Sequence, residues 1–322
     1  MSKKVILDVD TGSDDAVAIM LAEISEDIDL IGITTVNGNR NVDITTNNTL
    51  RVLDLLDLSI PVYKGCHLPM VSTLLKGRRD NVPYTGPEDK DQDVHGDHLP
   101  IPDAKSSAQP EHAVSYLVDT LISTKEKITL IAVGPLTNLA MALRIAPDII
   151  KNVSEIIIMG GGYLINNITS GSEFNFWVDP EAAKIVLDCG APIRLVPLDA
   201  THAAYVSHDE CDQIREIGSL AARCCADLIQ QRIEGYNNFQ PMPVPHTVPV
   251  HDALAVCALI DPAVLQDCIQ VNVDVSFSPG ITDGMSLVDT GERNKTRKPN
   301  ALVARSADRE LFLSMLKQIL SN

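Results

Sequence analysis

The chain has 322 residues, of which 45% are hydrophobic and 21% are charged, and its formal net charge is −17 at pH 7. This length allows one large domain or two smaller ones, and the hydrophobic share is ample for a sizeable core. The negative charge argues against nucleic acid or an anionic membrane as a partner, because both would repel the chain. It suits a protein that handles a neutral or cationic small molecule, or a metal ion.

Apolar, β-branched segments alternate with helical patterns along the whole chain. Strands are predicted near 3–9, 30–36, 60–63, 128–133, 154–159, 193–198 and 269–275, and helices near 14–25, 42–57, 110–124, 137–145, 180–189, 208–232, 252–260 and 307–320. Such alternation predicts an α/β fold in which an open, mostly parallel twisted sheet carries helices on both faces. No internal repeat or linker divides the chain, so a single domain over residues 1–322 is expected.

Two long stretches interrupt the alternation. Residues 65–108 are rich in Pro, Gly, Asp and Lys, and residues 234–251 contain four prolines. Loops of this length in a compact domain are usually functional or disordered. We predict that both are lids over a site at the strand ends.

The seven cysteines are irregularly spaced and include no CxxC pair, which predicts reduced thiols rather than a disulfide framework. No apolar segment reaches the roughly 18 residues that a membrane helix needs, and the N-terminal residues lack the layout of a signal peptide. A cytoplasmic protein without a membrane partner is therefore expected.

The most informative motif lies at the beginning of the chain. An apolar strand stops at Asp10, a short turn follows, and Asp14 and Asp15 open a helix; with Asp8, four carboxylates fall within eight residues. In open α/β sheets this junction is where ligands bind. Asp14 and Asp15 alone are also explained by the helix dipole. The addition of Asp10 favours a metal site, and oxygen ligands suit calcium or magnesium better than zinc.

Further polar segments follow other predicted strands. They are Asn37-Gly-Asn39, Gly134-Pro-Leu-Thr-Asn138 and Gly160-Gly-Gly162. Each one alone is explained as a turn, a helix cap or a packing glycine. Because parallel strands place their carboxyl ends at one edge of the sheet, together these segments are expected to line one crevice.

Two other segments carry chemistry. Glu173-Phe-Asn175 places an acid and an amide around an aromatic ring, which suits the vicinal hydroxyls of a sugar; the alternative is a solvated loop. His251 precedes Asp252, which alone would be an ordinary helix N-cap. In an acidic crevice His251 suits a general acid or proton shuttle. His95, in the first long loop, either swings over a ligand or is solvated.

Together these motifs resemble the inosine-uridine-preferring nucleoside hydrolases. The matching segments are Asp8-Val-Asp-Thr-Gly-Ser-Asp-Asp15, Gly134-Pro-Leu-Thr-Asn138, Met159-Gly-Gly-Gly162, Glu173-Phe-Asn175 with Asp179-Pro-Glu-Ala-Ala183, and His251-Asp252. Their order and spacing agree over nearly the whole chain. The resemblance implies a Rossmann-like nucleoside hydrolase fold, a homotetramer or homodimer, and hydrolysis of ribonucleosides to ribose and a free purine or pyrimidine base in nucleoside salvage.

The resemblance also implies roles for single residues. A calcium ion would be held by Asp10, Asp15, Asp252 and the main-chain carbonyl of Val133. Asp10 would take the proton of the attacking water, and His251 or His95 would protonate the departing base.

The implied ribose contacts come from several segments. Asp14, Asn39, Asn167, Glu173 and Asn175 resemble the residues that hold the sugar hydroxyls, and Met159 and Phe174 would pack against the sugar. Purine-specific relatives stack the base between tryptophans. The single tryptophan here, Trp177, lies beside Glu173-Phe-Asn175 rather than in a lid, so strict purine specificity is not expected.

Two other functions remain open at this point. The strand that carries Asp8 and Asp10 also resembles the nucleophile loop of haloacid-dehalogenase-type phosphatases. Alternatively, the chain is a calcium-dependent protein that binds a nucleoside or ribose without cleaving it. Release of reducing sugar separates the second alternative from a hydrolase.

Overall fold

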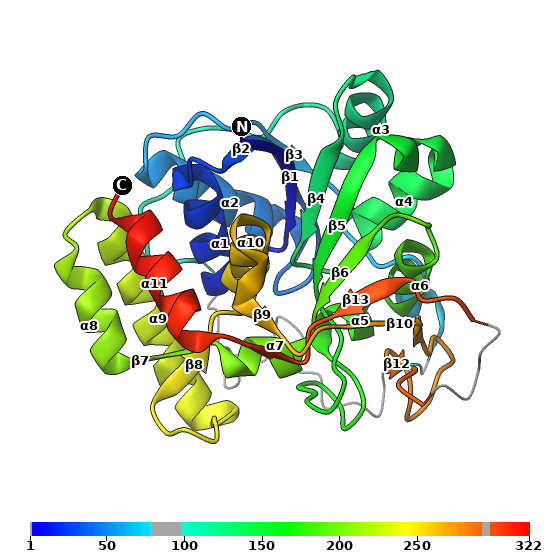
Figure 1. Ribbon diagram of the computed structural model, residues 1–322. Coiled ribbons are helices and arrows are strands. Elements are labelled where there is room, and N and C mark those ends of the chain that lie inside the picture. The colour runs from blue at the N-terminus through cyan, green and yellow to red at the C-terminus, as the bar shows by residue number, and fades with distance from the viewer. Residues whose placement is uncertain (1, 77, 79–97, 292–296) are drawn as a thin grey trace.

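The computed structural model of the chain describes residues 2–76, 78, 98–291 and 297–322 (Figure 1). Its centre is an 8-stranded sheet in the order β10-β13-β6-β5-β4-β1-β2-β3. All neighbours in this sheet are parallel except β10 and β13, which pair antiparallel. The strands are β1 (Lys3–Val9), β2 (Ile28–Thr35), β3 (Val62–Lys64), β4 (Ile128–Ala132), β5 (Val153–Met159), β6 (Ile193–Val196), β10 (Ile269–Val271) and β13 (Ala301–Val303).

Helices cover both faces of the sheet, as the alternation predicts (Figure 1). One side carries α1 (Ser13–Ile24), α2 (Val42–Leu55), α9 (Leu220–Phe239), α10 (His251–Ile260) and α11 (Arg309–Leu320), and the other carries α3 (Ala113–Ser123), α4 (Thr137–Ile145) and α6 (Pro180–Leu187). Alternate side chains of β1 enter two separate cores: Val5 and Leu7 pack on the first side and Ile6 on the second. The predicted fold class is confirmed.

Smaller elements complete the fold. They are α5 (Phe174–Val178), α7 (Leu198–Ala203), α8 (His208–Glu216), the strands β7 (Tyr205–Ser207), β8 (Thr247–Pro249), β9 (Leu265–Gln266), β11 (Val273–Val275), β12 (Ser286–Val288) and β14 (Ser306–Ala307), and the 3₁₀ turns η1 (Ser72–Leu74), η3 (Pro147–Asn152) and η4 (Pro262–Val264). In the described part of the chain, no helix has both the length and the apolar character needed to cross a membrane.

The prediction of one strand near 269–275 is wrong. The chain leaves the main sheet after Val271, and β11 pairs with β12 in a separate two-stranded sheet. Asn300 holds this break: its backbone N–H donates to Val271, its side-chain oxygen accepts the N–H of Val273, and its amide donates to the Val273 carbonyl. Side-chain amides that replace backbone partners end a strand without any break in its apolar pattern.

The prediction of one helix over 208–232 is also wrong. Gly218, at φ +85°, separates α8 from α9 in a backbone conformation that favours glycine. Ser219 then caps α9 by accepting the N–H of Ala222 at 3.0 Å. Because α9 continues to Phe239, the stretch predicted as a second lid, 234–251, begins inside a helix. Its later part contains β8 and ends at the first residue of α10.

Candidate active site

The junction between β1 and α1 is tied together by the side chain of Asp15. Gly12 is the N-cap of α1, and its N–H donates to Asp15 Oδ2 at 2.9 Å, while the N–H of Asp10 donates to Oδ1 at 3.1 Å. A carboxylate in the first helical turn thus closes the turn that follows the strand. The helix N-terminus explains part of why Asp14 and Asp15 are present, but it leaves Asp10 unexplained.

The carboxylate of Asp10 is packed between two glycines. A Cβ at Gly38 would lie 2.0 Å from Oδ2, and a Cβ at Gly134 would lie 2.8 Å from Oδ1, so a larger residue at either position would collide with the carboxylate. The N–H of Asn39 donates to Oδ2 at 2.7 Å. Oδ1 is buried and has no hydrogen-bond partner among the described residues. The segments after β2 and β4 therefore close around one carboxylate, as their place at the sheet edge predicts.

Asp252 joins this junction from the first turn of α10. Carboxylate oxygens of Asp14, Asp15 and Asp252 lie within 4.8 Å of one another, and all three residues are buried. Asp252 is not an N-cap, because Val250 holds that position. Burial, and then the neighbouring negative charges, raise the pKa of Asp15 to about 7 and hold the pKa values of Asp10 and Asp252 well above their usual range. Such a cluster requires positive charge nearby.

The donor set fits a hard cation. Asp10 Oδ1 is a buried oxygen that no described residue contacts by a hydrogen bond, and the neighbouring ligand groups are carboxylates and a main-chain carbonyl, which suit calcium. The carbonyl of Val133, at the end of β4, accepts a hydrogen bond from the amide of Asn175 at 2.8 Å and retains a second lone pair. Residues 10, 15, 133 and 252 are thus suited to hold the ion that the sequence analysis expects.

Arg232 of α9 places a positive charge directly beside the carboxylate cluster. Its guanidinium contacts both oxygens of Asp14, with Nη1 3.0 Å from Oδ1 and Nη2 2.9 Å from Oδ2. Nη1 also donates to Ser13 Oγ, and Nε donates to the carbonyl of Pro249. The residue is only 3% exposed. The pairing of Arg232 with Asp14 depends on how helices far apart in the chain pack together.

His251 lies between two hydroxyl groups. Its Nε2 is 2.8 Å from the hydroxyl of Tyr236, and its Nδ1 is 2.7 Å from Oγ1 of Thr201 in α7. His251, Tyr236 and Thr201 are all buried. Both ring nitrogens are therefore held in a fixed direction beside Asp252, an arrangement that suits a proton donor or a positioning group. Sequence reasoning misses Thr201, because nothing in the α7 sequence sets it apart.

Asn175 lies in the short helix α5, and Glu173 immediately precedes that helix. Glu173 is the N-cap: its Oε1 accepts the N–H of Asn175 at 2.8 Å, and its Oε2 accepts the N–H groups of Gly161 at 2.8 Å and Phe176 at 3.1 Å. Burial raises the pKa of Glu173 to about 7. The Glu173 carboxylate thus fixes the glycine segment after β5 against α5.

The remaining expected sugar contacts surround this helix. The amide of Asn175 also donates to the Met159 carbonyl at 3.1 Å and lies 3.5 Å from the Met159 sulfur. Asn167 Oδ1 accepts the N–H of Phe174 at 3.0 Å, and Phe174 is half-buried. Asn39, on the opposite side of Asp10, points its amide toward Asp15 Oδ2 at 3.4 Å. His95 lies outside the described residues.

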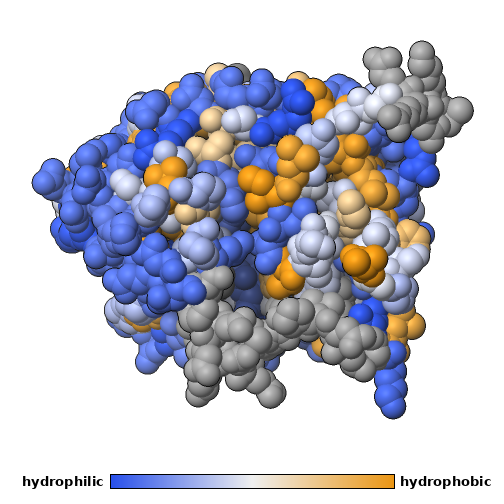
Figure 2. All heavy atoms as spheres, turned by 90° about the horizontal axis from the view of Figure 1, so that it is seen from below, coloured by the Kyte–Doolittle hydropathy of each residue, from blue (hydrophilic) through white to orange (hydrophobic). Residues whose placement is uncertain are grey.

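These side chains come from the edge at which the parallel strands end. Seen from below, this face of the molecule is hollowed near its centre, with hydrophilic residues on the left of the hollow and hydrophobic residues on its right (Figure 2). The arrangement combines a carboxylate cluster, one arginine, a histidine held by hydroxyls and a buried acid–amide pair. Chemically it suits a neutral polyol on which positive charge develops.

Comparisons with known proteins agree with this chemistry. The sequence model described as inosine-uridine preferring nucleoside hydrolase matches residues 5–314. The chain is 36% identical over 282 residues to a pyrimidine-specific ribonucleoside hydrolase of Escherichia coli O17:K52:H18, covering 86% of this chain and 85% of that protein. It is 35% identical over 296 residues to the inosine-uridine preferring nucleoside hydrolase of Crithidia fasciculata, covering 90% and 88%.

Solved structures give the same result. A plant nucleoside hydrolase has a TM-score of 0.87 at 28% identity, with 100% of this chain and 99% of that chain covered. A purine-preferring ribonucleoside hydrolase from Gardnerella vaginalis has a TM-score of 0.87 at 29% identity, with 99% and 98% covered. These similarities extend over the whole sheet and both helical layers.

Proposed function

This chain belongs to the inosine-uridine preferring nucleoside hydrolase family and is a ribonucleoside hydrolase, and we propose that it uses calcium to cleave the N-glycosidic bonds of both purine and pyrimidine ribonucleosides. The observation that carries this proposal is the buried Asp10 Oδ1, which has no hydrogen-bond partner among the described residues and lies beside an acidic cluster.

Asp10, Asp15, Asp252 and the carbonyl of Val133 would hold the calcium ion. When bound, the ion supplies positive charge that orients the ribose hydroxyls and the attacking water. The Asp10 carboxylate accepts a proton from that water, whose oxygen forms a bond to C1′ of the ribose. The C1′–N bond breaks, and its electron pair goes to the base.

The protein stabilises the charge that develops on the sugar. Breaking the C1′–N bond gives the ribose oxocarbenium character, which nearby carboxylates stabilise electrostatically. Asp14, Asn39 and Asn175 hold the sugar hydroxyls, and Asn167 and Glu173 act at the other end of the ribose. Met159 and Phe174 pack against the ring and exclude water from it.

The departing base requires a proton. His251 donates it, and the hydroxyls of Tyr236 and Thr201 fix the orientation of the imidazole. His95 remains a second proposed donor. A general acid contributes roughly 10²–10⁴-fold to the rate.

Base preference follows from what surrounds the leaving group. Trp177 is buried in α5, where its backbone is packed against Gly284, so it is not available to stack on a base. Relatives include a pyrimidine-specific enzyme and a purine-preferring one. We therefore propose a broad specificity, in the salvage of nucleosides by a cytoplasmic homotetramer or homodimer.

The phosphatase alternative meets a specific obstacle. Asp8, the first aspartate of the resembling loop, is 1% exposed, and its Oδ1 accepts hydrogen bonds from Asn138 at 2.8 Å and from Thr34. Asp8 also lies inside β1, with Thr34 of β2 on one side and Ala132 of β4 on the other, whereas a nucleophile for a phosphate ester is expected at the strand end. The binding-protein alternative has no observation in its favour.

One experiment separates the three functions. Purified protein with calcium is given p-nitrophenyl riboside, p-nitrophenyl phosphate, uridine and inosine in parallel. The proposal predicts nitrophenol from the riboside alone, and one free base with one reducing sugar from each nucleoside. Nitrophenol from the phosphate, or bound nucleoside without released sugar, would overturn it.

A further inference from the structure

The acidic cluster contains more carboxylates than the proposed calcium site uses. The three that lie closest together are Asp14, Asp15 and Asp252. The proposed carboxylate ligands are Asp10, Asp15 and Asp252. Asp14 lies close to two of these ligands, but its proposed role is to hold a ribose hydroxyl. If Asp10 rather than Asp14 is a ligand, the protein must hold Asp14 away from the ion although its carboxylate lies close to those of Asp15 and Asp252.

The contacts of Arg232 distinguish Asp14 from Asp10. It binds both oxygens of Asp14 at 2.9 and 3.0 Å, a two-pronged contact that fixes the plane of the carboxylate as well as its position. The carboxylate of Asp10 is not paired with a cation in this way. Its Oδ2 accepts the N–H of Asn39, while its Oδ1 is without a hydrogen-bond partner among the described residues. One aspartate is occupied by a cation from the protein, and the other offers an unpaired oxygen.

The charge balance also favours Asp14 as the carboxylate that does not bind the ion. Four carboxylates, Asp10, Asp14, Asp15 and Asp252, carry four negative charges when ionised, and Arg232 neutralises one of them. A divalent ion is then left facing three carboxylates rather than four. Because like charges repel strongly in a site with little water, Arg232 also repels the ion from the side of Asp14.

Further contacts of Arg232 restrict the movement of its ion pair with Asp14. Its Nη1 is also in contact with Ser13, its Nε with the Pro249 carbonyl, and its guanidinium carbon lies 5.2 Å from the centre of the Tyr236 ring. Arg232 thus touches the turn that carries Asp14, the strand that leads into α10, and the partner of His251. A buried side chain held from three directions has little freedom to release its carboxylate.

We propose that Arg232 keeps Asp14 out of the calcium coordination sphere and presents it to a ribose hydroxyl instead. Arg232 is in this sense a positioning residue, since it acts through Asp14 and not on the substrate. The inference rests on the proposed function, because it presupposes that the cluster binds calcium.

The test counts water molecules on a bound ion. Europium(III) substitutes for calcium in oxygen-rich sites, and its luminescence lifetimes in H₂O and D₂O report how many waters remain coordinated. Measurements are made on the wild-type protein, R232M, D14N and the double variant R232M/D14N. Calcium affinity is measured on the same chelator-treated proteins by calorimetric titration.

We expect R232M to bind europium with about one coordinated water fewer than the wild type, because Asp14 becomes a ligand. Its calcium affinity should rise about tenfold or more, since a nearby positive charge is removed. The double variant should regain the wild-type water count, because the freed ligand is gone. D14N alone should also keep the wild-type count, and this result does not depend on whether R232M folds.

The matched control is R309M. Arg309 makes contacts of the same kind with other residues: it pairs with Glu210, and its guanidinium carbon lies 4.2 Å from the ring centre of Tyr205. This variant should change neither the water count nor the calcium affinity.

Several outcomes contradict the inference. An additional water in D14N would mean that Asp14 is already a ligand beside Arg232. An unchanged water count in R232M, even with tighter calcium binding, would reduce Arg232 to a source of charge. Failure of the wild-type protein to bind calcium or europium at all would instead overturn the metal in the proposed function, so the two failures are distinguishable.

Discussion

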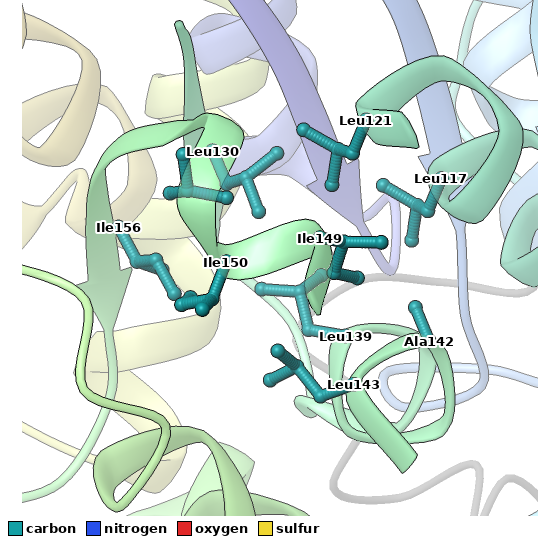
Figure 3. Close-up of a pocket in the computed structure, with 10 residues that line it drawn as sticks. Leu117, Leu121, Leu130, Leu139, Ala142, Leu143, Ile149, Ile150 and Ile156 are labelled. Atoms are coloured by element: carbon teal, nitrogen blue, oxygen red, sulfur yellow. The ribbon is translucent and has the colours of Figure 1, made fainter. Parts of the chain in front are cut away.

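Two regions of this molecule are buried to a similar degree but are built in opposite ways. At the carboxyl edge of the sheet, four carboxylates and one arginine are packed together away from water. Between the sheet and helices α3 and α4, ten aliphatic side chains surround a small cavity of about 10 Å³ (Figure 3). The second region is stable by itself, because apolar burial is favourable and needs no partner.

The first region carries an electrostatic cost. Burial raises the pKa values of its carboxylates, which means that their charged forms are costly in the absence of a cation. Residues kept at such a cost usually serve a ligand or a reaction. The comparison shows that a functional site can be recognised by buried charges that the protein does not fully neutralise. The apolar region has no such uncompensated group.

The largest expected effect comes from removing a carboxylate of the cluster. Asp10→Ala or Asp252→Ala should abolish turnover, with a loss of at least about 10⁴-fold, because charge, geometry and the proposed base are lost together. Asp252→Ala should also lower the calcium content measured by elemental analysis. Retention of more than a tenth of the activity in either variant would remove that residue from the site.

The ribose hydroxyls provide the next test. Sites that pair buried polar groups with substrate hydroxyls reject analogues that lack them by about 10⁴-fold or more. Thymidine should therefore be cleaved at least about 10⁴-fold more slowly than uridine, judged by kcat/KM. If Glu173 meets the 5′-hydroxyl, uridine monophosphate should be rejected as well. Similar kcat/KM values for uridine and either analogue would contradict the assigned ribose contacts.

His251 should affect only substrates whose leaving group needs a proton. His251→Ala should slow inosine cleavage by roughly 10²–10⁴-fold and leave p-nitrophenyl riboside nearly unchanged. Tyr236→Phe, which removes one of the two hydroxyls that orient the imidazole, should show the same substrate dependence with a smaller loss. Equal losses on both substrates would make His251 a packing residue and leave His95 as the candidate donor.

Stability measurements test the comparison without any substrate. Leu139→Ala, in the aliphatic region, should lower the free energy of unfolding by about 2–5 kcal/mol and leave kcat/KM unchanged. The same substitution at Leu164, which is 77% exposed, should change it by less than about 0.5 kcal/mol. The isosteric Asp252→Asn should instead stabilise the calcium-free protein, because it removes a buried like charge. Loss of stability in Asp252→Asn would contradict the repulsion inferred for the cluster.

The parts of the site that are contiguous in sequence are the parts that sequence analysis predicts. Asp10, Asp14 and Asp15 fall within one strand–turn–helix segment, and the rule that parallel strands end at one edge places Asn39 and Gly134 beside them. The layered α/β fold follows from the same alternation of strand and helix patterns.

Pairings between distant segments are not readable in this way. Nothing local indicates that Arg232 faces Asp14, or that Thr201 faces His251, because each contact depends on how helices pack across the sheet. The break at Gly218 is different, because a glycine followed by a serine is a typical signal in the sequence for the end of one helix and the N-cap of the next.

The most direct test of the central claim is release of ribose before and after the removal of calcium. The protein is assayed with uridine and inosine as purified, after exhaustive chelation with metal loss verified by elemental analysis, and after calcium is returned. The account predicts that both activities disappear with the metal and return with calcium. Full activity of the verified metal-free protein would contradict it.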